Sequence, residues 1–96
     1  MNSHQKDEST VRLIVKGKVQ GVFYRASAKE EAKALGLRGW VRNTPEGHVE
    51  AVATGEHQAL SQFIDWCKKG PPSAQVTVVD IIPEELTQFE RFSVLK

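Results

Sequence analysis

One segment of the chain combines residue types that could hold a phosphate group. It runs from Gly17 to Arg25 as Gly-Lys-Val-Gln-Gly-Val-Phe-Tyr-Arg. Its two glycines let a loop turn several backbone N–H groups toward one point, beside a helix start whose dipole is positive. Arg25 adds a fixed charge and a planar guanidinium that can grip two oxygens of an anion. The segment favours an anion site, although a tight turn followed by a surface arginine would give the same pattern.

Asn43 is the second candidate, at the end of a predicted strand over residues 37–43. It has the same strand parity as Val41, so we expect its amide on the helix-covered face of the sheet. A carboxamide there can accept a hydrogen bond from a water and donate one to a phosphate oxygen. The alternative is that Asn43 only begins the turn Thr44-Pro45-Glu46-Gly47, which is a common position for asparagine.

The spacing of apolar residues predicts the elements that position these two candidates. Alternation of apolar and polar residues indicates strands, and apolar residues at i, i+3, i+4 and i+7 indicate helices. Gly-Pro-Pro at residues 70–72 ends the second helix. The expected order is strand, helix, strand, strand, helix, strand over residues 11–16, 23–35, 37–43, 48–54, 57–69 and 76–82, and residues 91–95 can add a last short strand.

This order predicts an α+β protein, the ferredoxin-like βαββαβ sandwich, in which two helices cover one face of an antiparallel sheet. The first crossover is expected to be right-handed, so the first two predicted strands run parallel and end at the same edge. The loop that follows the first strand should therefore lie beside Asn43. We expect a single domain over residues 10–96, preceded by a disordered polar tail over residues 1–9.

Composition excludes several other classes of protein. The 96 residues include 13 Lys plus Arg and 12 Asp plus Glu, and this near-neutral balance argues against a nucleic-acid-binding module. No apolar run approaches the ~20 residues of a membrane helix. The single Cys67 cannot form an internal disulfide, which indicates a cytoplasmic protein. We expect no metal site, because His4, His48 and His57 do not form a ligand set, and we expect a monomer.

The Gly17–Arg25 segment and the segment over residues 39–50, Gly-Trp-Val-Arg-Asn-Thr-Pro-Glu-Gly-His-Val-Glu, together resemble both signature motifs of the acylphosphatase family. The similarity covers nearly the whole chain, from about Thr10 to Leu95. Many microbial members of the family have glycine at the position of Phe23, and phenylalanine also occurs there.

The resemblance implies hydrolysis of the carboxyl–phosphate bond of small acyl phosphates to a carboxylate and inorganic phosphate, with no cofactor and no metal. Arg25 would bind the phosphoryl group, and Asn43 would orient the attacking water. Backbone amides would cradle the phosphate oxygens, at Gln20, Gly21, Val22 and Phe23. Such a site is chemically sufficient, because a carboxylate leaving group with a pKa of about 4 needs no acid and phosphoryl transfer depends mainly on positioning and charge stabilisation.

Two other functions stay open at this point. The chain could be a domain that binds acyl phosphates, or responds to them, without turnover. The same order of elements also serves single-stranded RNA binders, whose central strands carry aromatic residues that stack on bases. The predicted strand over residues 48–54 has no aromatic residue, which weighs against RNA binding. No residue is assigned to the acyl side of the substrate, so acetyl phosphate, carbamoyl phosphate and 1,3-bisphosphoglycerate are equivalent candidates.

Overall fold

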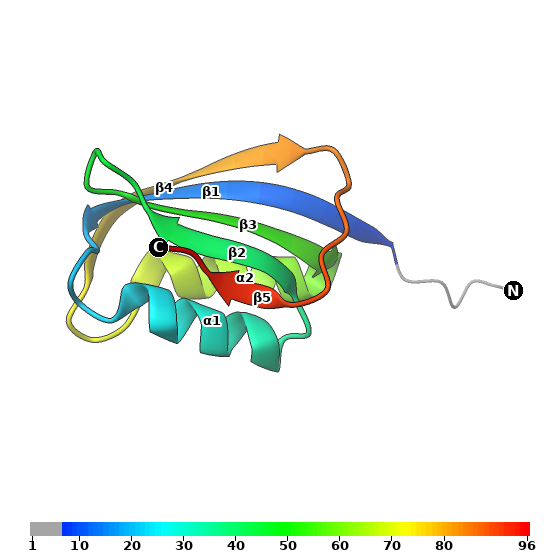
Figure 1. The fold of residues 1–96 in the computed structure, drawn as a ribbon, viewed down its shortest axis with the longest axis horizontal. Helices are drawn as coiled ribbons and strands as arrows, with labels where there is room; N and C mark the ends of the chain where they lie inside the picture. The colour runs from blue at the N-terminus through cyan, green and yellow to red at the C-terminus, as the bar shows by residue number, and fades with distance from the viewer. Residues whose placement is uncertain (1–6) are drawn as a thin grey trace, which may run out of the picture.

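The computed structural model describes residues 7–96 (Figure 1). Its elements are β1 (Glu8–Lys18), α1 (Tyr24–Ala34), β2 (Arg38–Asn43), β3 (Val49–Glu56), α2 (His57–Lys69), β4 (Gln75–Glu84) and β5 (Phe92–Val94). The predicted βαββαβ order is confirmed, and so is the short strand near the C-terminus.

The first strand begins earlier than the sequence pattern predicts. Glu8 and Ser9, which the pattern assigned to a polar tail, belong to β1 and pair with the end of β3. The Glu8 carboxylate also accepts a hydrogen bond from the Arg38 guanidinium at 2.8 Å. The rest of the predicted tail, apart from the exposed Asp7, lies outside the described residues.

The five strands form one sheet in the order β4-β1-β3-β2-β5. β1 is antiparallel to β3 and β4, and β2 is antiparallel to β3, so β1 and β2 run parallel as predicted. The sheet is not antiparallel throughout, because β5 pairs with β2 in parallel. The chain reverses direction after β4 and runs along the end of the sheet to β5 (Figure 1), which gives β5 the direction of β1 and β2.

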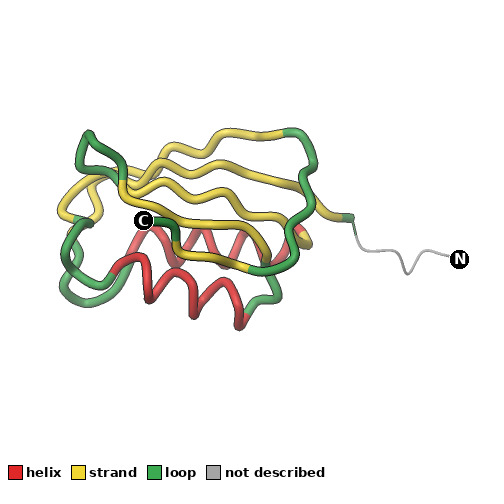
Figure 2. The backbone as a smooth tube through the Cα atoms, viewed as in Figure 1, coloured by secondary structure: helices red, strands yellow, loops and turns green. Residues whose placement is uncertain are grey.

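Both helices cover the same face of the sheet (Figure 2). The core lies between these two layers, and each buried side chain of Leu, Val or Phe size contributes about 1.5–3 kcal/mol. α1 buries Tyr24, Ala28 and Ala32, and α2 buries Leu60, Phe63 and Cys67. These positions recur at helical spacing, which is why the sequence pattern located both helices.

The other face of the sheet carries paired charges. The Glu50 carboxylate binds the guanidinium groups of both Arg12 and Arg42, the second at 2.7 Å. The Arg12 guanidinium also lies 6.0 Å from the centre of the Trp40 ring. Trp40 and Arg42 thus share this face, as their strand parity predicts. Arg12 also pairs with the Glu84 carboxylate at 2.8 Å, so two glutamates balance the charge of these two arginines.

Candidate active site

β1 contains a bulge shortly before the loop that leads to α1. The pairing of β1 with β4 shifts register between Lys16 and Gly17, and Gly17 has a φ of 127°. A β-carbon at Gly17 would collide with the carbonyl oxygen of Gln75 in β4. At Gly21 an added β-carbon would meet no atom within 4 Å, but the φ of 74° is one that residues with a side chain rarely adopt. The backbone conformation, and not a steric contact, therefore favours glycine there. Gly17, which the sequence pattern placed in the loop, therefore belongs to the end of β1, and only Gly21 lies in the loop itself.

The backbone of this loop presents hydrogen-bond donors that the protein itself does not use. None of the amide N–H groups of residues 20–23 donates a hydrogen bond to another described residue. They lie immediately before the N-terminus of α1, where the helix dipole also favours negative charge. The first turn of α1 contains no acidic residue. This arrangement supports the predicted cradle for an anion.

Phe23 adopts a backbone conformation that is unusual for a bulky residue. It precedes α1 with φ 64° and ψ 22°, in the left-handed region, and its carbonyl accepts the first helical hydrogen bond, from Ser27 at 3.1 Å. A non-glycine residue held there costs about 1–3 kcal/mol, and such strain concentrates at functional sites. The ring is 81% exposed.

Tyr24 fixes the start of α1 in the core. Its hydroxyl donates a hydrogen bond to the Cys67 carbonyl at 2.7 Å, and its ring centre lies 5.4 Å from that of Trp66. Both partners belong to the last turns of α2. The neighbouring Arg25 is therefore carried on a helix start that cannot shift without disrupting the packing between the two helices.

The Arg25 side chain is held by the C-terminal end of the chain. Its Nη1 donates a hydrogen bond to the Leu95 carbonyl at 3.0 Å, and the Leu95 amide donates to the Val41 carbonyl at 2.8 Å. The residues after β5 thus connect Arg25 to β2, the strand that ends with Asn43. Sequence reasoning did not identify this role, because Leu95 is 70 residues from Arg25 and carries no polar side chain.

Asn43 is the last residue of β2 and pairs with Val49 of β3. Its Oδ1 is the only buried side-chain oxygen or nitrogen among residues 7–96 without a hydrogen-bond partner. Leaving a buried acceptor unsatisfied costs about 1–3 kcal/mol. The following turn is closed by Thr44 instead, whose carbonyl accepts from Gly47 at 3.1 Å and whose hydroxyl accepts from the His48 amide at 3.1 Å. The Asn43 side chain is therefore not the group that starts the turn.

Arg25 and Asn43 line the same cavity, which has a volume of about 340 Å³. That volume could contain several water molecules at about 30 Å³ each. The structure thus brings together the two residues that topology predicted to meet, and no carboxylate or histidine lines the cavity. Its other lining residues are Val19, Gly21, Phe23, Tyr24, Ala26 and Val94.

The side chain of Gln20 links the two halves of this site. Its Nε2 donates hydrogen bonds to the carbonyls of Thr44 at 2.9 Å and His48 at 2.8 Å. The loop between β1 and α1 is thereby attached to the turn that follows Asn43. The sequence analysis assigned a role only to the backbone amide of Gln20. A carboxamide side chain next to a loop glycine suggests a hydrogen-bonding role, but its partners could not be identified without the register of β2 and β3.

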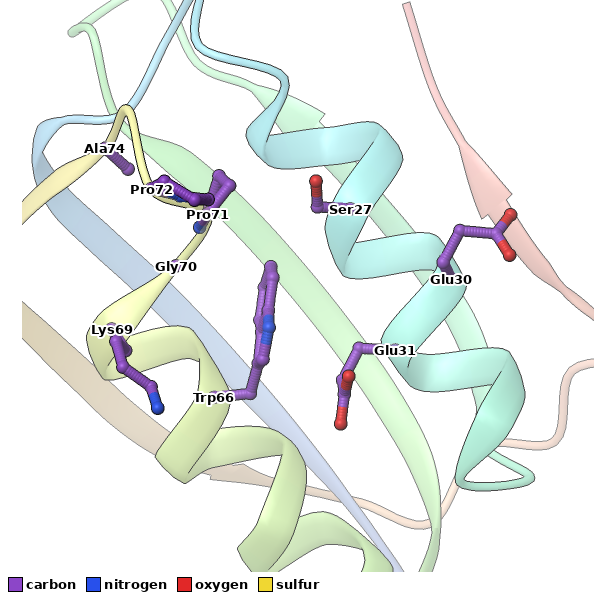
Figure 3. A pocket seen from close by; sticks show the side chains of 9 residues that line it. All are labelled: Ser27, Glu30, Glu31, Trp66, Lys69, Gly70, Pro71, Pro72 and Ala74. Carbon is purple, nitrogen blue, oxygen red and sulfur yellow. The ribbon is translucent and has the colours of Figure 1, made fainter.

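A second cavity, of about 770 Å³, lies where the start of α1 meets the end of α2 and the segment after it (Figure 3). Trp66 of α2 lines it, with Ser27 and Glu31 of α1 opposite, and Glu30 points away from the indole. The Gly-Pro-Pro segment at residues 70–72 also lines this cavity. None of the predicted site residues lines this cavity.

The remaining candidates do not assemble into a site. The His57 ring contacts the Ser9 hydroxyl at 2.6 Å, and His4 lies outside the described residues. Residues 7–96 contain no group of three or more His, Cys, Asp or Glu side chains placed to hold a metal ion.

Burial raises the pKa of Cys67 to about 12, so its thiol is unreactive at neutral pH. None of the helices in the described part has the length and apolarity needed to cross a membrane.

Comparison with known proteins agrees with this geometry. The model of the acylphosphatase family matches residues 11–94. The chain is 48% identical over 86 residues to the acylphosphatase of Acaryochloris marina, which covers 90% of this chain and 92% of that protein. An acylphosphatase structure from Coxiella burnetii superposes with a TM-score of 0.91 at 38% identity, covering 96% of this chain and 99% of the other. The Bacillus subtilis acylphosphatase gives a TM-score of 0.88 at 38% identity, with coverage of 91% and 98%. Because sequence and fold agree over nearly the full length of these relatives, the chain belongs to the acylphosphatase family.

Proposed function

We propose that Arg25 and Asn43 divide the work of the acylphosphatase reaction in this chain: Arg25 binds the phosphoryl group, and Asn43 orients the water that attacks it. The observation that carries this proposal is the unpartnered Oδ1 of Asn43, buried in the wall of the cavity that Arg25 also lines. A buried acceptor without a protein donor is suited to accept a hydrogen bond from a water molecule.

Phosphate binding uses the guanidinium and the loop backbone together. The Arg25 guanidinium can donate to two phosphate oxygens at once. Further donors are the backbone amides of the loop, which donate no hydrogen bond to any described residue: those of Gln20, Gly21, Val22 and Phe23. These groups are fixed in place before the substrate binds, so they stabilise charge that develops on the phosphate oxygens without reorganising during the reaction.

The chemical step needs no side chain that exchanges a proton with the substrate. The water oxygen attacks phosphorus, the bond from phosphorus to the acyl oxygen breaks, and the carboxylate leaves with the electron pair. A carboxamide does not titrate near neutral pH, so Asn43 orients the water and the proton passes to a phosphate oxygen of the substrate. The leaving carboxylate has a pKa of about 4 and departs without an acid.

We infer that the enzyme acts as a cytoplasmic monomer on small acyl phosphates, with no nucleic-acid partner. The single cysteine supports a reducing compartment. The near-neutral charge and the pairing of Arg12 and Arg42 with Glu50 disfavour phosphate-backbone binding on the open sheet face. A domain that binds acyl phosphates without turnover has less support, because anion binding alone would leave the Asn43 acceptor without a partner.

Phosphate release from acetyl phosphate tests the proposal in wild type, Asn43→Ala and the control Gln62→Ala, which removes an exposed carboxamide from α2. We expect kcat to fall about 100-fold in Asn43→Ala, since misplacing a reacting group by ~1 Å costs that much. Competitive inhibition by inorganic phosphate should be nearly unchanged, and the control should behave as wild type. Loss of phosphate inhibition in Asn43→Ala would make Asn43 a binding residue and contradict its assigned role.

A further inference from the structure

The cavity that contains Arg25 and Asn43 has an apolar rim on its loop side. Phe23 stands on the loop and Ala26 on the first turn of α1, and both line the cavity next to the polar groups. The phosphoryl group needs the guanidinium and the loop amides, but it makes no use of an apolar rim. This part of the wall has no assigned function.

The Phe23 side chain is the most exposed of the large hydrophobic residues in the described part of the chain, at 81%; the next, Leu86, is 56% exposed. Its ring takes part in none of the aromatic contacts of the core. The backbone position is also one that glycine or asparagine would occupy with less strain. Neither packing nor backbone geometry therefore explains a phenylalanine at this position.

In-line displacement determines where the acyl group must point. The attacking water and the leaving oxygen lie on opposite sides of phosphorus. If the water is held by Asn43 on the β2 wall, the acyl group leaves away from β2. The loop that precedes α1 forms a wall of its own, and Phe23 is the large side chain on it.

Building on the proposed roles of Arg25 and Asn43, we propose that Phe23 forms a subsite for the acyl group and that the enzyme favours acyl phosphates with a large apolar, preferably aromatic, acyl group. Contact with such a group removes apolar surface of both partners from water, and two aromatic rings gain further from offset or edge-to-face packing. The contact lies away from the reacting atoms and is made equally in the ground state and the transition state. It therefore lowers KM more than it raises kcat.

Steady-state kinetics with benzoyl phosphate and acetyl phosphate test the subsite in wild type, Phe23→Asn, Phe23→Gly and Phe23→Tyr. Asparagine and glycine both tolerate the left-handed backbone, so they remove the ring without distorting the loop. Comparing kcat/KM for the two substrates within each variant, and then between variants, cancels the difference in their intrinsic reactivity. Leu86→Ala is the matched control, because it removes an exposed apolar side chain that does not line the cavity.

We expect the preference for benzoyl phosphate to fall about tenfold in Phe23→Asn and Phe23→Gly, mainly through KM. It should persist in Phe23→Tyr and in Leu86→Ala. An unchanged preference in the asparagine and glycine variants, with both substrates hydrolysed by wild type, would overturn the subsite and leave the roles of Arg25 and Asn43 intact. Failure of the wild-type enzyme to hydrolyse either compound would overturn both proposals together.

Discussion

The side-chain amide of Gln20 donates a hydrogen bond to the carbonyl oxygen of Thr44 at 2.9 Å, and a second one to that of His48 at 2.8 Å. The loop that would hold the phosphoryl group and the turn after Asn43 are thereby joined by one side chain. We therefore expect the distance between the proposed phosphate donors of the loop and the Asn43 amide to depend on this connection.

Gln20→Leu should lower kcat more than it weakens phosphate binding. The variant keeps the backbone amides of the loop but removes both donors to the turn, so Asn43 loses its alignment with the bound phosphate. We expect kcat on acetyl phosphate to fall by about tenfold or more, with a smaller change in inhibition by inorganic phosphate. Gln20→Glu should not restore kcat, because a carboxylate cannot donate to the two carbonyls. Gln58→Leu, at an exposed position of α2, is the matched control; a wild-type kcat in Gln20→Leu would show that the connection is dispensable.

Arg25→Ala should lose both phosphate binding and turnover. Removing one preorganised donor to a developing oxyanion costs about 10²–10³ in kcat, and Arg25 also supplies the fixed charge of the cavity. Arg25→Lys should recover little of this loss, since a point charge cannot replace a planar fork. The measurements are kcat/KM on acetyl phosphate and the inhibition constant of phosphate, with the exposed Arg91→Ala as control. Near-normal activity in either Arg25 variant would refute the assigned role.

Chelation of divalent metals should leave the activity unchanged. In the proposed chemistry a guanidinium and backbone amides stabilise the negative charge that develops on the phosphate oxygens, so no step requires a metal ion. Enzyme dialysed against EDTA and assayed on acetyl phosphate should match the untreated enzyme. Activity that disappears on chelation and returns with an added divalent cation would require a different mechanism.

Stability should fall above pH 9 through the Cys67 thiol. Burial raises its pKa from 9.0 to about 12, so this contribution is fully present below pH 9 and is lost as pH rises toward 12. At pH 10 the thiol is mostly ionised in the unfolded chain only, which lowers the free energy of unfolding by roughly 1 kcal/mol. The free energy of unfolding should therefore drop by that much more between pH 8 and pH 10 in wild type than in Cys67→Ala. Equal slopes would mean that the thiol titrates normally in the folded protein.

Local patterns in the sequence predict most of the fold. Side chains repeat every 3.6 residues on a helix and every two on a strand, so a buried face is visible in the order of residues alone. The stripe of Leu60, Phe63 and Cys67 locates α2, and the handedness of the first crossover places Arg25 near Asn43. The start of β1 escaped prediction because Glu8 is polar and is held by Arg38, a partner 30 residues away.

The sequence by itself determined the order of the elements and the crossover, because these follow from local periodicity and from the handedness of the chain. The residue types of the candidate site are read directly from the sequence. Only the tertiary structure decided the parallel pairing of β5 with β2, the contact of Arg25 with Leu95, the link from Gln20 to Thr44 and the isolation of the Asn43 oxygen. The first three join residues that are distant in sequence through backbone groups, and every residue carries the same backbone groups. Such contacts leave no pattern in the order of side chains, and they appear only when the strands take their register.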